Sequence, residues 1–370
     1  MTEARPAFYA LAPGGWRDYL TVLHPPYTAW HLSYVAIGAT LAPHFYADRL
    51  GAAAAAFFLA LGIGAHALDE WEGRPLQTRI PERTLLALTV VSLAGAAARR
   101  STERSGIRRR LRQAAEPGRV HGALGPTRMT EARPAFFALA PGGWRDYVTL
   151  LHLPYTAWHL SFVVLGAALA PKLHEGRLAA ALVAFFLAMG IAAHALDELK
   201  GHPLATRIPD RMLVGLTVVS LAAAVAIGIA GAVAFDLWLL IFVAVGATLV
   251  PAYNLELFGG AIHNNLGFAL AWGGFPLLTG YFACAGTISW VALLAAGYAT
   301  LASYAQRTLS TPVRHARRRV AAVTGTLELR DGTREPLTHE LLYGAQERAL
   351  ELLAAANVCL AVAVLLLKLT

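Results

Sequence analysis

Long apolar runs separated by short polar segments dominate this chain. Between residues 155 and 369 there are seven such runs, and each reaches the roughly 17–25 residues that a helix needs to cross a bilayer. Many of their positions are Ala or Gly, as expected where membrane helices pack backbone to backbone. The pattern therefore predicts an all-α, polytopic membrane bundle with helices at 155–171, 177–196, 212–232, 237–253, 266–283, 288–304 and 351–369.

A polar insertion, 305–347, separates the last two runs. It contains TGTLELRDGTREPLT, in which a strand-like alternation surrounds Asp331 and Gly332. Because Asp-Gly favours a tight hairpin turn, we expect a small β-hairpin in this insertion.

The first 98 residues recur further along the chain. The segment MTEARPAFYALAPGGWRDYLTVLHPPYTAWHLS at Met1 returns as MTEARPAFFALAPGGWRDYVTLLHLPYTAWHLS at Met129, and roughly 70 of 98 positions are identical at an offset of 128. Short structural repeats are usually shorter and more diverged. We interpret 1–98 as a truncated duplicate of the first two to three transmembrane helices, 99–128 as an arginine-rich linker and 129–370 as the working seven-helix domain. The duplicate either packs on that domain or is a passenger without function.

Composition and charge support a membrane protein. Hydrophobic residues make up 56% of the chain and charged residues 15%, whereas a soluble domain carries about 25% charged residues. The net charge of +8 lies mostly in short arginine runs between apolar segments, which favours a topological signal over nucleic-acid binding. The predicted outer segments hold only Lys172, Arg177 and Lys368. We therefore expect a multi-pass protein of the cell membrane with a cytoplasmic N-terminus and no nucleic-acid partner.

The stretch AHALDELKGHPLATRIP, 193–209, places polar chemistry at the end of the second predicted span. On a helix, His194, Asp197 and Glu198 are three and four residues apart and share one face. Two carboxylates there suit a divalent cation that also bridges to phosphate oxygens. The alternative is that the carboxylates pair with the basic residues that follow them, Lys200, Arg207 and Arg211.

The order of segments resembles a known family. After this acidic helix end and its basic, proline-containing loop come RMLVGLTVVSLAAAVAIGIAGA and LVPAYNLELFGGAIHNNLGFALAWGGFPLLTGYF. Over 154–304 this arrangement is similar to the UbiA-type membrane prenyltransferase superfamily. The resemblance implies a UbiA-like helical bundle that transfers a polyprenyl group from its diphosphate to a small or lipid acceptor. It also implies Mg²⁺ as cofactor, and polyprenyl diphosphate and membrane lipid as binding partners.

Both acidic motifs of that family are incomplete in this chain. The first, Asn-Asp-x-x-Asp-x-x-x-Asp, falls on Ala193, His194, Asp197 and Gly201, so only Asp197 is kept. The second, Asp-x-x-x-Asp, should follow the sixth helix, where the chain reads ASYAQRTLSTPVRHARRRV without an acidic residue. Arginine binds phosphate in a bidentate manner, so the arginines of this segment are candidates to replace the second metal.

The resemblance assigns roles to individual residues. Asp197 and Glu198 would hold magnesium, and the catalytic residues would be Asp197 and His194, the latter as auxiliary ligand or proton acceptor. The expected substrate-binding residues are Arg207 in the basic loop, Tyr253 and Asn254 beside the acceptor, and Arg307 and Arg314 beside the diphosphate. Simpler explanations stay open: the arginine run 317–319 as an anchor near anionic lipid, and YNLELFGGAIHNN as an ordinary polar connection.

Two functional hypotheses follow from these residues. The first is a diverged prenyltransferase, and the second is a non-catalytic membrane protein that binds isoprenoid lipid or partner helices. A metal–histidine set is disfavoured, because HxxxH and HExxH spacings are absent among its candidates, His152, His159, His194 and His263.

Overall fold

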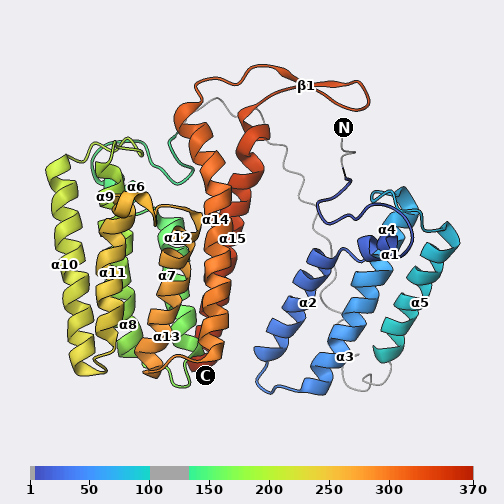
Figure 1. Ribbon diagram of the computed structural model, residues 1–370, viewed down its shortest axis with the longest axis horizontal. Coiled ribbons are helices and arrows are strands. Elements are labelled where there is room, and N and C mark those ends of the chain that lie inside the picture. The colour runs from blue at the N-terminus through green and yellow to red at the C-terminus, as the bar shows by residue number, and fades with distance from the viewer. Residues whose placement is uncertain (1–4, 101–132, 370) are drawn as a thin grey trace, which may run out of the picture. The chain divides into compact units, whose positions relative to one another are not determined.

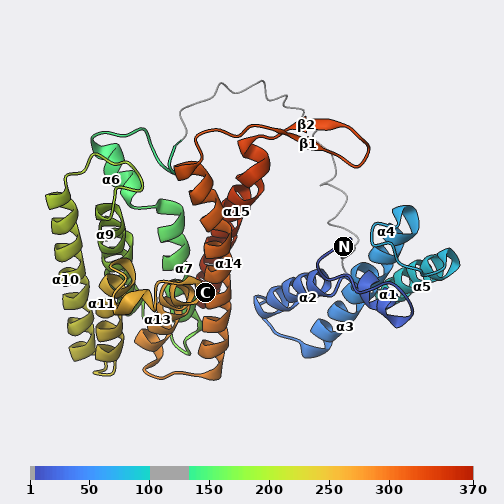
Figure 2. The ribbon, with the colours of Figure 1, turned by 45° about the horizontal axis from the view of Figure 1, so that its top comes forward.

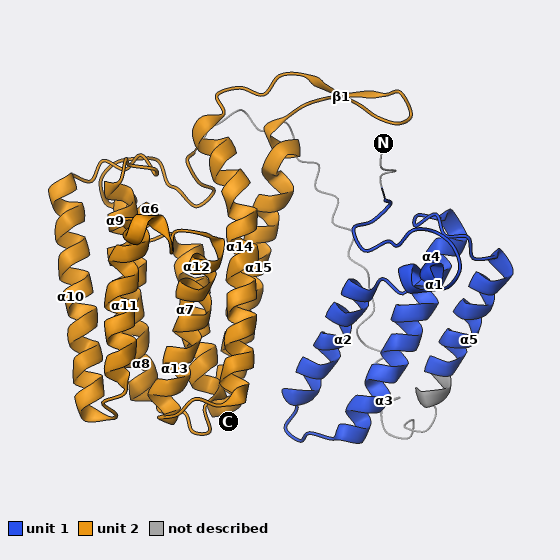
Figure 3. Ribbon diagram, in the orientation of Figure 1, with its two compact units in different colours: residues 1–124 blue, residues 125–370 orange. Residues whose placement is uncertain are grey.

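The chain divides into two compact units, Met1–Leu124 and Gly125–Thr370 (Figure 3). The computed structural model describes residues 5–100 and 133–369, so the predicted linker at 99–128 lies almost entirely outside the described residues.

The second unit is a helical bundle with one small hairpin, which confirms the all-α prediction for the described residues (Figure 1, Figure 2). It begins with α6 (Trp144–Leu150), α7 (Leu153–Leu169) and a rod of α8 (Glu175–Phe185), the π-helical segment η2 (Phe186–Ala193) and α9 (His194–Leu199). There follow α10 (Asp210–Ala234), α11 (Leu239–Asn254), η3 (Phe258–Gly260) and a second rod of α12 (Asn265–Ala269), η4 (Leu270–Gly274) and α13 (Phe275–Ala285). The last helices are α14 (Trp290–Arg319) and α15 (His339–Leu369), with β1 (Thr326–Glu328) and β2 (Arg334–Pro336) forming the expected antiparallel hairpin between them.

Several of these helices are long and apolar enough to cross a membrane. In the second unit they are Glu175–Leu199, Asp210–Ala234, Asn265–Ala285 and His339–Leu369, and α6 with α7 forms a further candidate span bent by 45°. The predicted span at 237–253 corresponds to the shorter apolar helix α11, and the one at 288–304 lies in α14, whose second half carries arginines. By length and composition, these are the helices of a multi-pass membrane protein.

Helix α7 packs against α13 and α15. A Cβ atom added to Gly166 would lie 2.0 Å from the Leu277 carbonyl oxygen, and one added to Gly280 would lie 2.2 Å from that of Val163. Such close backbone approach requires glycine and is typical of membrane helix pairs. The contact fixes α7, which carries part of the site, against the second half of the bundle.

The first unit contains α1 (Trp16–Val22), α2 (Pro25–Thr40), α3 (Ala47–Phe57), η1 (Phe58–Ala65), α4 (His66–Gly73) and α5 (Glu82–Arg100). Each of these elements starts 128 residues before its counterpart among α6 to α10. One candidate span, Ala47–Gly73, lies in this unit. The described residues of the unit contain no counterpart of α11 to α15, and its origin as a truncated duplicate stays a prediction from sequence identity.

The loop between α9 and α10 is folded around Glu198, which is 1% exposed. One carboxylate oxygen of Glu198 accepts a hydrogen bond from the Leu204 backbone N–H at 2.9 Å, and the other accepts from the Thr206 N–H and hydroxyl at 3.0 and 2.8 Å. Asp146 accepts the next N–H, that of Arg207, at 3.1 Å. In the first unit Glu70 makes the same bonds to its own loop. Glu198 is therefore a loop anchor.

Replacing Glu198 with alanine should lower the free energy of unfolding by at least about 2 kcal/mol, because two backbone N–H groups and one hydroxyl lose their partner. Thermal and denaturant unfolding in detergent would measure the loss. Glu256→Ala is the control, because its ion pair with Lys200 is half-exposed and such pairs contribute little. Equally small effects of both substitutions would contradict the loop-anchor role.

Candidate functional site

A polar cavity of about 230 Å³ lies within the second unit. A single water needs roughly 10–15 Å³ by this measure, so the cavity has room for an organic group. Its walls come from the segment before α6, the start of α7, the end of η2 and α9, the region from α11 to η4, the second half of α14 and the start of α15. The cavity therefore joins segments that are far apart in the sequence.

The structure brings most of the predicted site residues to this cavity. On its walls are His194, Asp197, Tyr253, Asn254, Arg307 and Arg314. Glu198 and Arg207 are not among the lining residues: Glu198 anchors the loop, and the Arg207 backbone N–H binds Asp146. The predicted common helical face is therefore confirmed for His194 and Asp197. Glu198 points into the loop instead.

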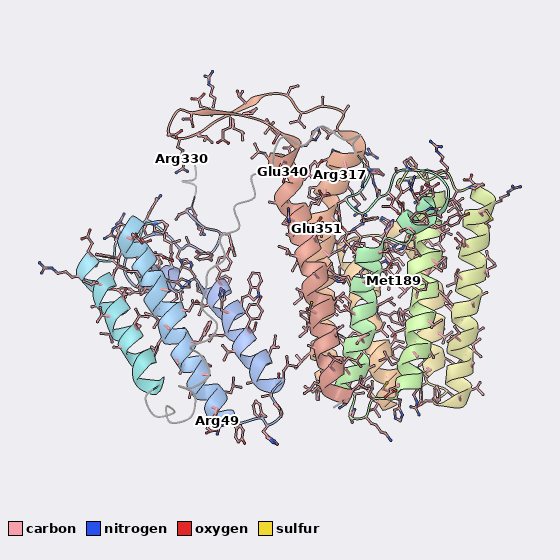
Figure 4. All side chains as sticks on the ribbon, turned by 180° about the vertical axis from the view of Figure 1, so that it is seen from behind. Arg49, Met189, Arg317, Arg330, Glu340 and Glu351 are labelled. Carbon is pink, nitrogen blue, oxygen red and sulfur yellow. The ribbon has the colours of Figure 1, made fainter. Side chains whose placement is uncertain are left out.

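Three arginines of α14, Arg307, Arg314 and Arg318, form one wall of the cavity, here called the arginine wall. They are seven and four residues apart and so lie on one face of the helix. The neighbouring Arg317, labelled near the end of α14 in Figure 4, is neutralised by Glu347 of α15 through bonds of 2.7 and 2.6 Å. The lining carboxylates are Glu347 and Asp197. Asp197 is thus the carboxylate that faces the arginine wall.

The charges of the arginine wall are suited to an anion. Burial, together with repulsion from Arg307 and Arg318, lowers the pKa of Arg314 to about 10. Burial also lowers the pKa of Arg318, and the negative charge of Asp197 partly opposes this shift. Both side chains are still cations at neutral pH. An anion between them would relieve their repulsion and accept charge-assisted hydrogen bonds.

The histidines His152, His159, His194 and His263 all line the cavity. Three of them bond through Nδ1 to a backbone carbonyl: His159 to Trp272 at 2.7 Å, His194 to Gly190 at 3.1 Å and His263 to Tyr253 at 2.9 Å. A carbonyl can only accept, so in each ring Nδ1 carries the hydrogen, and the neutral ring offers Nε2 as an acceptor. The fourth ring, His152, lies against His194 with centroids 4.0 Å apart.

Two of these acceptor carbonyls belong to π-helical segments. Gly190 lies in η2, the segment that ends directly before His194. Trp272 lies in η4. π-Helical turns are rare in proteins, and those that occur are often found at functional sites. Both segments here bring a carbonyl to a cavity histidine and so fix the orientation of its ring.

The donor set gives limited support for magnesium. The described residues contain no group of three or more His, Cys, Asp or Glu that could hold a metal ion. Both oxygens of Glu198 accept hydrogen bonds from the loop and the side chain does not line the cavity, so Glu198 is not placed to share a metal ion with Asp197. The pair as placed does not fit the predicted metal site, and only Asp197 faces the cavity.

Sequence reasoning did not single out Gln306, Tyr155 or the N-terminal segment 134–137, which also line the cavity. It treated Arg318 as part of the run 317–319, which was a candidate to replace the second metal, with anchoring near anionic lipid as the alternative. The spacing of Arg307, Arg314 and Arg318 on one helical face was a signal that these three side chains could line a common wall.

No protein-family model matches the sequence, and no curated protein or solved structure is significantly similar to it. The resemblance to the prenyltransferase superfamily therefore depends on the quoted segments alone.

Inorganic diphosphate should raise the melting temperature of the full chain, and Arg314→Met should abolish most of this increase. Because the folded-state pKa of Arg314 is below its ordinary 12.5, its charge opposes folding at every pH below about 10. The variant should accordingly melt at a higher temperature than the unmodified chain without anion at neutral pH. Arg330→Met, in the exposed hairpin, is the control; an equal diphosphate response in both variants would contradict an anion site at the wall.

Proposed function

We propose that the second unit is a diverged prenyltransferase-type protein that binds a polyprenyl diphosphate in the polar cavity and transfers its prenyl group to a small or lipid acceptor. The observation that carries the proposal is the arginine wall facing the free carboxylate of Asp197 inside a bundle of apolar helices. Guanidinium groups bind phosphate oxygens in bidentate pairs, and apolar helices suit an isoprenoid chain. The UbiA-like arrangement of segments points to the same chemistry.

The arginine wall would stabilise the leaving group. When the bond between the first prenyl carbon and the diphosphate breaks, negative charge develops on the diphosphate. Fixed cations in a site of low dielectric stabilise such charge without having to reorganise. Asp197 limits the repulsion between the arginines, because Arg314 and Arg318 both interact favourably with its charge. The arginines therefore supply the charge that the missing second acidic motif would otherwise hold through metal.

His194 is suited to accept the proton that the acceptor loses. Its Nδ1–H is held by the Gly190 carbonyl, which leaves Nε2 free to act as a base. Asp197 lies one turn later on the same face and would stabilise the imidazolium ion that forms. The proton acceptor and the cationic wall thus come from different helices, α9 and α14, on the same cavity.

A second hollow offers space for hydrocarbon. This groove, of about 120 Å³, is lined by α8, α10, α11 and α13, and its surface is mostly apolar, with many Ala and Gly residues. Membrane lipid or an isoprenoid chain fits such a lining. By the positive-inside rule, the arginine-rich end of the bundle, with the cavity, would face the cytoplasm in the cell membrane.

A second candidate function is non-catalytic binding of an isoprenoid lipid or of partner helices. The observation that favours it is the engagement of Glu198 in the loop, since the cavity then has one free carboxylate where the resembling family has several acids.

Farnesyl diphosphate, offered to the full chain in nanodiscs of bacterial lipid extract, should release inorganic diphosphate. Asp197→Asn should slow this release at least tenfold, and Arg314→Met by about 10²–10³-fold, because each removes a charge that acts on the leaving group or proton acceptor. The matched control is Asp69→Asn, the equivalent position of the first unit, which should leave the rate unchanged. Magnesium dependence is measured in parallel.

The same experiment separates the two functions. Saturable binding of farnesyl diphosphate without release would support the non-catalytic binder. Absence of farnesyl diphosphate binding in the unmodified chain would overturn the prenyltransferase proposal.

A further inference from the structure

The apolar groove between α8, α10, α11 and α13 is separate from the polar cavity. Of the described residues, none lines both hollows. On α8 the groove is lined from Arg177 to Ala188, which corresponds to about 16 Å of helix at roughly 1.5 Å per residue. One leaflet of a bilayer has a hydrocarbon thickness of about 15 Å, half of the whole core. The groove therefore has the length of an acyl chain in one leaflet.

The groove reaches the end of the bundle that lies opposite the polar cavity. Arg177 is in the first turn of α8, and Phe235, Leu239 and Ala283 line the groove where α10 ends, α11 begins and α13 ends. The polar cavity is lined by residues from the other ends of these rods, such as Tyr253 of α11. By the positive-inside rule, the Arg177 end faces the outer leaflet.

Small residues leave the groove open where a larger side chain would fit. A Cβ atom added to Gly231 of α10 would have only the Phe235 ring near it, at 4.0 Å. At the contact between α7 and α13, by contrast, a Cβ atom added to Gly166 would collide with a backbone carbonyl. Glycine at position 231 therefore does not serve close helix packing, and the space beside it is available to a ligand.

Arg177 is the charged residue among the described residues that line the groove. Its guanidinium lies 4.4 Å from the centroid of the Phe235 ring and donates to the Ala283 carbonyl at 3.3 Å. In the described part of the chain no carboxylate forms an ion pair with it. Because arginine has five N–H donors, most of them remain for another acceptor. A phosphate group suits them, since it accepts bidentate hydrogen bonds from guanidinium.

The charges around Arg177 also favour an anion. Burial, together with the positive charges of Arg177 and Lys172, lowers the pKa of His174, so both cations act on the same place beside the groove. Two acids lie at this end of the bundle as well. Asp236 accepts a hydrogen bond from the Trp238 backbone N–H at 2.9 Å, and Glu175 is exposed to solvent. Neither carboxylate neutralises Arg177.

We infer that the groove binds the acyl chain of an anionic phospholipid from the outer leaflet, and that the phosphate of this lipid pairs with Arg177. The apolar lining, the length of one leaflet and a cation at the headgroup end together match this ligand. The inference goes beyond the proposed function, because it uses neither the arginine wall nor prenyl transfer. A lipid held there would stabilise the packing of α8, α10, α11 and α13, since a ligand that binds only the folded state shifts the unfolding equilibrium.

Two lipids with the same acyl chains test the headgroup contact in the full chain, purified in a neutral detergent. Dioleoyl phosphatidylglycerol should raise the melting temperature at about tenfold lower concentration than dioleoyl phosphatidylcholine, whose choline offsets the phosphate charge. Arg177→Met should abolish this difference. Arg211→Met is the matched control, because Arg211 lies at the other end of α10 and does not line the groove. Inorganic phosphate should have no effect, because it lacks the acyl chain.

A second pair of variants tests the acyl-chain contact. Gly231→Leu should fill the groove and reduce the response to both lipids. Without lipid it should melt at a higher temperature than the unmodified chain, because leucine occupies empty space and favours the helix. Gly215→Leu is the control: Gly215 is also in α10, has no atom within 4 Å of an added Cβ atom and lies outside the groove.

Three results would each overturn the lipid site. They are equal responses to the two lipids in the unmodified chain, a headgroup preference that persists in Arg177→Met, and a lipid response in Gly231→Leu as large as in Gly215→Leu. Stabilisation by inorganic phosphate that Arg177→Met removes would replace the lipid with a free anion. The diphosphate response, which Arg314→Met removes, should be unchanged in Arg177→Met and Gly231→Leu, so failure of the proposed function is detected separately.

Discussion

The hydrocarbon core of a membrane offers no hydrogen-bond partner, and this constraint organises the second unit. Several polar side chains within its helices bond to one another or to backbone carbonyls. Asn357 of α15 donates to the Ser161 hydroxyl of α7 at 2.6 Å, and His159 of α7 donates to the Trp272 carbonyl of η4 at 2.7 Å. These bonds, with the glycine contact between α7 and α13, hold helices together where the hydrophobic effect cannot discriminate between lipid and protein. The bundle can then carry polar groups at one end.

The polar cavity is where this rule is relaxed. Its walls combine the arginine wall with the carboxylate of Asp197, which faces it. Several of its buried polar atoms have no hydrogen-bond partner. Both properties lower the stability of the unliganded protein, and a bound anion would relieve the repulsion between the arginines. Strain of this kind at a cavity is expected where binding, rather than folding, determines the choice of residue.

Two adjacent carboxylates show how local geometry divides roles. Asp197 faces the cavity. Glu198, one residue later, turns into the following loop and accepts hydrogen bonds from it. In the first unit Glu70 bonds to its loop in the same way, whereas Asp69 is exposed, and the described part of that unit lacks helices equivalent to α11–α15. The loop anchor is therefore a property of the short repeated segment, and the cationic environment of Asp197 depends on α14.

The sequence by itself determined the helices, their apolar character, the hairpin and most of the candidate residues, because these follow from local periodicity and residue chemistry. It indicated as site residues six that line one cavity: His194, Asp197, Tyr253, Asn254, Arg307 and Arg314. Tertiary structure alone decided that Glu198 anchors a loop, that Arg317 is neutralised by Glu347 and that the side-chain oxygen of Gln306 is buried without a hydrogen-bond partner. Hydrogen bonding and charge pairing depend on which groups meet across helices, and spacing along the chain does not specify those meetings.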